Sequence, residues 1–185
     1  MSTAQFVRPA RSGDVERIVD LQVSSWKALY GPLLPEEVSS EMGSAEARKN
    51  FTEQWGSALA SPPTSKHRLV VATDEVGGVR TVTGFAALGP AGDPDLWPAT
   101  DAEVFALHVD PERTHEGHGS RLVNACVDHL SEDGFSTVHV WAAEQENPLR
   151  SFFESAGWRP DGARSEIDLG TLLPMVRLHA AVPAT

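Results

Sequence analysis

The chain has 185 residues, of which 41% are hydrophobic, and this is enough to bury the core of one domain. Its 15 Lys and Arg residues against 26 Asp and Glu residues give a net charge of −11. Such a surface repels nucleic acid and anionic membranes and suits a cationic small molecule or a basic peptide, although solubility explains the acidity equally well. The single cysteine, Cys126, excludes an internal disulfide and is expected in the core. Because no apolar run is as long as a membrane span or resembles a secretory signal, we expect a cytoplasmic protein without nucleic-acid or membrane partners.

The N-terminal part of the chain is predicted to be mainly helical. Residues 5–9 favour a short edge strand that a proline ends. Ser12 then caps a helix, in which apolar residues recur at helical spacing over residues 15–30. A second helix is expected to begin after Pro35, and a third spans about residues 45–60.

The rest of the chain predicts a mixed sheet. Residues 68–73 and 81–88 favour an antiparallel pair, and the stretch 89–100, rich in proline and aspartate, is expected to be an exposed loop. The remaining predicted elements are strands at 102–109, 136–141 and 175–182, a helix at 148–156, and a turn at 159–162. No repeat or linker divides the chain, so residues 1–185 are expected to form a single domain with helices on both sides of the sheet.

The stretch from Asp101 to Trp141 organises the chain. An apolar strand, in which Glu103 is the acidic exception, leads through a loop containing Gly117 and Gly119 to the start of an amphipathic helix. The free N–H groups and the dipole at such a start favour an anion, and glycine leaves room for it. The loop lacks the lysine of a Walker loop, and Leu122 stands where a Rossmann fingerprint has its third glycine, so neither of these sites is predicted.

This arrangement resembles the acyl-CoA loop, R/Q-x-x-G-x-G/A, of the GNAT-superfamily N-acetyltransferases. Residues 102–109 look like the fourth strand of that family, and residues 147–158 look like its N…FYExxGF helix. The resemblance implies an α/β protein with the GNAT acyl-CoA N-acyltransferase fold, in which helices flank a central, mixed, mostly antiparallel sheet. It also implies that acetyl-CoA is the co-substrate and that its acetyl group moves to a primary amine by direct attack in a ternary complex. Whether the acceptor is a small molecule or a peptide, and whether the protein is a homodimer, stays open.

The resemblance assigns cofactor binding to three segments. Strand N–H groups face the thioester carbonyl, the glycine loop binds the pyrophosphate with Arg113 and Arg121 nearby, and an asparagine contacts the pantetheine. The residues are Leu107 and Val109 in the strand, Thr114, His115, Glu116, Gly117, His118, Gly119 and Ser120 in the loop, and Asn147. Thr114 stands where the family has Arg or Gln, and Glu146 occupies the usual position of the asparagine.

Glu103 is the expected catalytic residue, because it matches the strand glutamate that is the general base in some members of the family. Its apolar neighbours should raise its pKa, and the alternative is a glutamate at the rim that faces water. Trp26 and Tyr30 either line the acceptor pocket or pack in the core. Phe153 replaces the tyrosine that commonly serves as general acid, so solvent is expected to protonate the departing thiolate.

One alternative remains for the function, and one candidate metal site has to be considered. The first is a non-catalytic, acyl-CoA-binding regulatory protein of the same fold, which would need the glycine loop but not Glu103. The second is a zinc site at His115 and His118, but their separation of three residues differs from the four of H-E-x-x-H, and we expect no metal.

Overall fold

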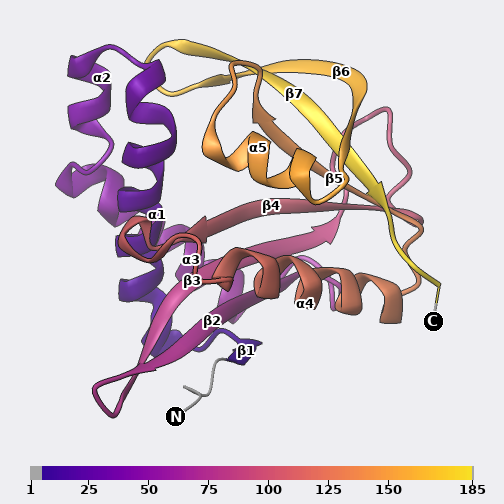
Figure 1. The fold of residues 1–185 in the computed structure, drawn as a ribbon, viewed down its shortest axis with the longest axis horizontal. Coiled ribbons are helices and arrows are strands. Elements are labelled where there is room, and N and C mark those ends of the chain that lie inside the picture. The colour runs from indigo at the N-terminus through magenta and orange to yellow at the C-terminus, as the bar shows by residue number, and fades with distance from the viewer. Residues whose placement is uncertain (1–5, 185) are drawn as a thin grey trace.

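The computed structural model describes residues 6–184 and places all strands in one twisted sheet (Figure 1). The strand order is β1-β2-β3-β4-β5-β7-β6. Neighbouring strands are antiparallel except β4 and β5, which are parallel. The strands are β1 (Phe6–Pro9), β2 (Arg68–Val76), β3 (Val79–Pro90), β4 (Asp101–Val109), β5 (Thr137–Ala143), β6 (Arg159–Asp168) and β7 (Leu172–Ala181).

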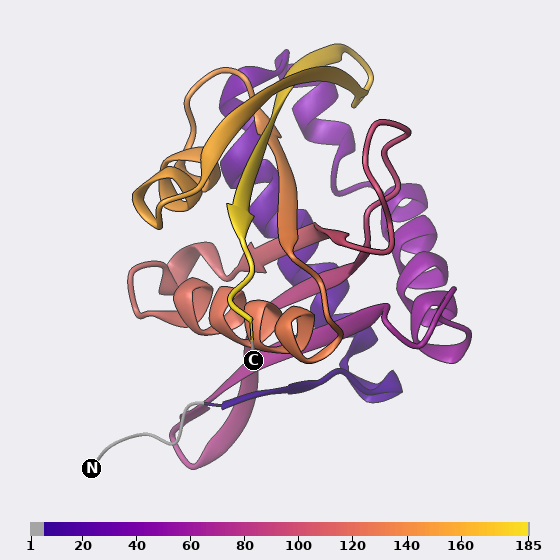
Figure 2. The same cartoon turned by 90° about the vertical axis from the view of Figure 1, so that its right-hand side faces the viewer.

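Helices cover both faces of the sheet, as predicted, and Figure 2 shows α4 and α1 on opposite sides of it. They are α1 (Val15–Tyr30), α2 (Glu36–Glu41), α3 (Ala45–Ala60), α4 (His118–Glu132) and α5 (Pro148–Ser155). On one face α4 buries Leu122 and Leu130, and on the other α1 and α3 bury Ile18 and Trp55. In the part of the chain that the structure describes, no helix is long and apolar enough to cross a membrane.

The contact between β4 and β5 is short. Their pairing begins at Asp101 and Thr137 and stops at Glu103 and His139, although β4 continues to Val109. Beyond that point β5 turns away from β4 and pairs only with β7 (Figure 1). The β4 edge that faces β5 is therefore open from Val104 onward.

A bulge in β4 changes which residues face each side of the sheet. Ala106 pairs with Ala87 and Val104 pairs with Leu88, so Phe105 is an extra residue in β4. Before the bulge, even-numbered Val104 packs on the α4 side, and after it odd-numbered Leu107 does. Glu103 and an even-numbered histidine, His108, consequently lie on the same side, toward α1 and α3.

Several predicted boundaries needed correction. The hairpin strands extend to Val76 and from Val79, so only two residues form the turn, and the predicted first strand included Gln5, which lies outside the described residues. The predicted turn at 159–162 is part of β6, an exposed and mostly polar strand. The pairing of β6 with β7 is irregular between Pro160 and Arg164, where the turn sequence lies. Ser12 does not cap α1, because it lies in a 3-10 turn (Ser12–Asp14), and the carboxylate of Asp14 accepts a hydrogen bond from the N–H of Arg11.

The buried cysteine was predicted correctly. Cys126 is 1% exposed between α4 and the sheet, and this burial raises the pKa of its thiol to about 12. A thiol that stays protonated in an apolar cluster packs as a small hydrophobic residue and has no nucleophilic role.

Phe153, which replaces the tyrosine of the family, lines neither of the two cavities that the structure contains near α5. Its side chain is fully buried, with its ring centroid 4.7 Å from that of Trp158, and it lies in the core beneath α5. The neighbouring Phe152 is half-buried and reaches the surface of a cavity instead. A tyrosine at 153 would therefore place its hydroxyl in the core.

We predict that Phe153→Tyr lowers the free energy of unfolding by about 1–3 kcal/mol, the usual cost of burying a hydroxyl without a partner. Phe152→Tyr is the matched control, and its half-buried ring should make the loss smaller. Urea unfolding followed by circular dichroism measures both variants. Stability of Phe153→Tyr equal to that of the parent would show that the core holds a partner for the hydroxyl.

Candidate active site

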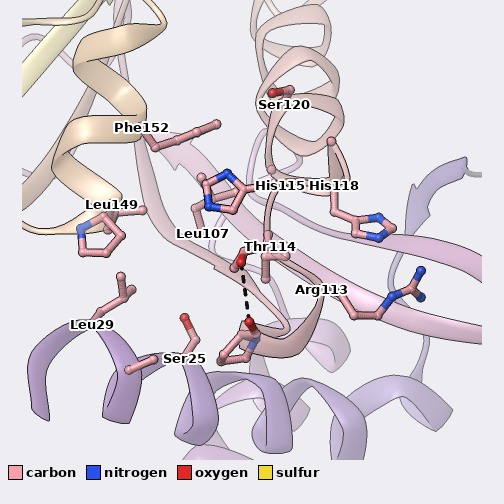
Figure 3. Close-up of a pocket in the computed structure, with 16 residues that line it drawn as sticks. Ser25, Leu29, Leu107, Arg113, Thr114, His115, His118, Ser120, Leu149 and Phe152 are labelled. Atoms are coloured by element: carbon pink, nitrogen blue, oxygen red, sulfur yellow. Dashed lines mark hydrogen bonds between the residues drawn. The ribbon is translucent and has the colours of Figure 1, made fainter.

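A cavity of about 480 Å³ opens where the N-terminus of α4, the end of β4, α1 and α5 meet (Figure 3). Figure 3 shows Leu149 and Phe152 entering it from α5 and Ser25 and Leu29 from α1. Most of the predicted cofactor-binding residues lie here: Leu107, Val109, Thr114, His115, Gly117, His118, Gly119 and Ser120 all line the cavity.

The glycine loop presents backbone donors to this cavity. Gly117 has φ +84°, and His115 has φ +65°, so the loop makes a tight, left-handed bend before α4. The N–H of Arg121 is bonded to the carbonyl of Gly117 at 3.1 Å. The N–H groups of His118, Gly119 and Ser120 precede that bond and have no intrahelical acceptor, because they belong to the first turn of the helix.

Arg113 lines the cavity and pairs with two carboxylates, while its buried Nη1 has no partner among the described residues. Its guanidinium contacts Asp74 and Glu116, each at 2.6 Å, and these carboxylates raise its pKa. Glu116 does not line the cavity, unlike the other predicted loop residues, and the pairing with Arg113 lowers the pKa of its carboxyl.

His118 faces inward from the start of α4. Its Nδ1 lies 3.1 Å from the hydroxyl of Thr83 and 2.8 Å from the guanidinium of Arg121, and burial lowers its pKa. Donor atoms of His118, Asp74 and Glu116 lie within 4.8 Å of one another and could hold a cation. The guanidinium of Arg113 already donates to both of these carboxylates.

A second cavity, of about 240 Å³, lies on the other side of Leu107 and Leu149, which line both cavities. The predicted base Glu103 and the predicted pocket residues Trp26 and Tyr30 all line this second cavity. Trp26 packs edge-on against Tyr30, with the ring centroids 6.0 Å apart. The structure thus brings the acceptor-side predictions together, separate from the glycine loop.

Burial raises the pKa of the Glu103 carboxyl, and the negative charge of Asp93 raises it further. A hydrogen bond from the backbone of Gly92 opposes this shift. Glu103 therefore holds a proton to a higher pH than an exposed glutamate does, which is the direction that improves a carboxylate as a base near neutral pH.

The open edge of β4 presents N–H groups that no neighbouring strand pairs. The N–H of Asp110 donates to the carbonyl of Thr83 on β3 at 2.9 Å. Since successive N–H groups of a strand point to opposite edges, those of Val109 and Leu107 point away from β3, toward the space that β5 has left. Strands β4 and β5 therefore diverge at these positions, as the predicted role of the Val109 and Leu107 N–H groups requires.

Asn147 lies outside both cavities. Its Oδ1 accepts a hydrogen bond from the N–H of Arg150 at 3.0 Å and caps α5, while its buried Nδ2 has no partner among the described residues. Its predicted contact with pantetheine stays a prediction. Glu146, the other candidate for this position, is exposed, and its carboxylate accepts a hydrogen bond from Ser151.

Sequence reasoning missed a buried pair that joins the two cavities. The hydroxyl of Ser25, which lines the first cavity, lies 3.0 Å from Nδ1 of His108, which lines the second. Burial lowers the pKa of His108 to about 3, so its imidazole is neutral. The available signal was a serine buried on the apolar face of α1.

The loop at 89–100 also proved to be more than an exposed connection. The guanidinium of Arg177 on β7 pairs with Asp93 and Asp95 of this loop and with Asp161 of β6, at 2.9, 2.7 and 2.7 Å. The indole N–H of Trp141 also donates to Asp93, at 3.0 Å. These bonds hold Asp93 near Glu103.

Comparisons with known proteins agree with this geometry. The sequence model of the Acetyltransferase (GNAT) family matches residues 23–158. The uncharacterized N-acetyltransferase YuaI of Bacillus subtilis is 30% identical over 149 residues, which are 80% of this chain and 77% of that protein.

Solved structures share the fold. The PaiA N-acetyltransferase of Thermoplasma acidophilum, in complex with coenzyme A, has a TM-score of 0.67 at 18% identity and covers 96% of this chain and 99% of its own. YncA of Salmonella typhimurium, solved with its cofactor acetyl-CoA, has a TM-score of 0.65 at 16% identity, with 98% and 96% covered. The family match over most of the sequence, the 30% identical relative and this fold place the chain in the GNAT acetyltransferase family, and the protein is an acyltransferase.

Proposed function

We propose that this acetyltransferase moves an acetyl group from acetyl-CoA to a primary amine by direct attack, with residues 1–185 acting as a single domain. The observation that carries the proposal is that two cavities lie next to each other and share Leu107 and Leu149 in their walls. One offers backbone donors suited to a phosphate and a thioester, and the other offers a carboxylate suited to an amine.

The larger cavity fits acetyl-CoA by its chemistry. The free N–H groups at the start of α4, together with the dipole of the helix, suit the pyrophosphate, and Gly117 and Gly119 leave space for it. The apolar walls formed by Leu149 and Phe152 suit the pantetheine arm. PaiA was solved in complex with coenzyme A and YncA with acetyl-CoA, which supports the same co-substrate here.

The reaction is proposed to occur where the cavities join. The amine nitrogen forms a bond to the thioester carbon, and the oxygen that gains charge accepts hydrogen bonds from the N–H of Val109 or Leu107. Glu103 takes the proton that the amine must lose. The carbon–sulfur bond then breaks, and the CoA thiolate, whose thiol has a pKa near ~8.5, takes its proton from solvent.

We predict that Gly119→Glu abolishes acetyl-CoA binding in a folded protein. A Cβ at this position would lie 3.4 Å from the ring of Phe152, which the fold can accommodate, but the carboxylate would occupy the space proposed for the pyrophosphate. Gly56→Glu is the control, since a Cβ at this glycine of α3 meets nothing within 4 Å. Calorimetry measures the affinity, and unchanged binding by the Gly119 variant would refute the proposed phosphate site.

We also predict that Glu103→Gln lowers kcat by about an order of magnitude or more near neutral pH, because general-base catalysis contributes roughly 10²–10⁴-fold. Acetyl-CoA affinity should not change. The loss should shrink at high pH, where the amine deprotonates in solution. The assay follows release of the CoA thiol, and Glu53→Gln, an exposed glutamate on α3, is the matched control.

Two outcomes would contradict this role of Glu103. A defect of the same size at every pH would show that the side chain positions the substrate and does not accept the proton. Failure of the unchanged protein to release CoA with any amine would favour the non-catalytic, acyl-CoA-binding alternative.

A further inference from the structure

We infer that the acceptor is an apolar primary monoamine, taken up as its ammonium form and carrying no carboxylate or phosphate. This inference rests on the proposed function and names the class of its acceptor. It comes from the walls of the second cavity and from the charges on and behind them.

The walls of the second cavity are mostly apolar and aromatic. Six aromatic residues line it: Trp26, Tyr30, Phe51, Trp55, Phe105 and Trp141. The Trp26 ring packs edge-on against Phe51, with centroids 5.3 Å apart, as it does against Tyr30. Rings fixed in this way offer their faces and edges to a hydrocarbon skeleton.

Some of the polar groups on the walls already have partners within the protein. The indole N–H of Trp55 donates to Oε1 of Gln22 at 2.6 Å inside the protein, and His108 is bonded to Ser25. Glu103 is the one acidic residue among the described lining residues, and none of these is Lys or Arg. The cavity therefore offers one carboxylate to an ammonium group, and its described lining offers no cationic side chain to an anionic one.

The charges behind the wall act in the same direction. Arg177 approaches the Trp141 ring, with its guanidinium carbon 5.6 Å from the ring centroid, but three aspartates surround it. Asp93, Asp95 and Asp161 against one arginine leave this group of residues anionic. The positive charge of Arg177 is consequently neutralised and cannot attract a carboxylate on the acceptor. The negative charges of Asp93 and Glu103 together favour an ammonium.

A second positive charge would find no second carboxylate among the described lining residues. The remaining walls include Ile167, Met175 and Leu149, which are apolar, and Gln54, which is neutral. A diamine that places one nitrogen at Glu103 would leave its other ammonium among apolar and aromatic groups, where the loss of hydration is not recovered.

The test compares 2-phenylethylamine with phenylalanine, which adds a carboxylate, and with 1,4-diaminobutane, which adds a second ammonium. The readout is kcat/KM from release of the CoA thiol by the full chain. We expect 2-phenylethylamine to exceed each of the others by about tenfold or more, because like charges and unpaired charges are strongly disfavoured at a binding surface. Equal or better use of phenylalanine or the diamine would overturn the inference and leave amine acetylation intact.

A pair of variants tests whether the lining charge sets the preference. Gln54→Arg adds a cation to the cavity lining from an exposed position on α3, while Thr52→Arg adds the same charge to an exposed position outside the lining. We expect Gln54→Arg to lower the ratio of kcat/KM for 2-phenylethylamine over phenylalanine and Thr52→Arg to leave the ratio unchanged. An equal change in both variants, or in neither, would contradict the assignment.

Calorimetry separates failure of this inference from failure of the proposed function. With CoA bound, the protein is titrated with 2-phenylethylamine and with 3-phenylpropionate, the acid of similar shape. If no amine releases CoA, the proposed transfer fails, and tighter binding of the amine than of the acid would still support the inference. Equal or tighter binding of the acid would overturn it.

Discussion

The site depends on the divergence of two neighbouring parallel strands. Buried backbone N–H groups are nearly always paired, so a strand whose edge lies open inside a protein is an exception that needs a cause. Here β3 pairs with β4 from Ala102 to Val109, apart from the bulged Phe105, but the pairing of β5 with β4 ends at Glu103. Leu107 of β4 and Leu149 of α5 line both the cavity at the glycine loop and the cavity at α1 and α3. One departure from regular pairing thus leaves backbone donors of β4 unpaired beside both cavities.

The electrostatic arrangement follows the same division. On the side of the glycine loop, Arg113 and Arg121 lie beside backbone donors, and the positive end of α4 faces the cavity. On the acceptor side, Asp93 and Glu103 dominate, because Arg177 is surrounded by aspartates. The backbone donors at the start of α4 and the carboxylate of Glu103 therefore belong to different cavities, whose walls share residues of β4 and α5.

The parts predicted well were those that local pattern determines. Apolar periodicity fixed α1 and α3, and the strand–loop–helix order around Gly117 and Gly119 placed the first cavity. The strand β6 was missed because it is exposed and polar, so it lacks the alternation that marks a strand. The Ser25–His108 contact and the Arg177 cluster join residues far apart in the sequence, and no spacing rule reports such pairs. The side on which Phe153 lies depends on how α5 packs, which its helical spacing alone did not determine.

The bulge at Phe105 also affects how this strand is compared between proteins. In a strand with one extra residue, the side chains that face a given side of the sheet are even-numbered on one side of the bulge and odd-numbered on the other. An ungapped alignment with a relative that lacks the bulge would match Glu103 to a residue on the opposite face of the sheet. Comparisons of acidic residues in this strand should therefore allow a one-residue gap at position 105, and the loss or gain of a single residue there would exchange the set of side chains that the acceptor meets.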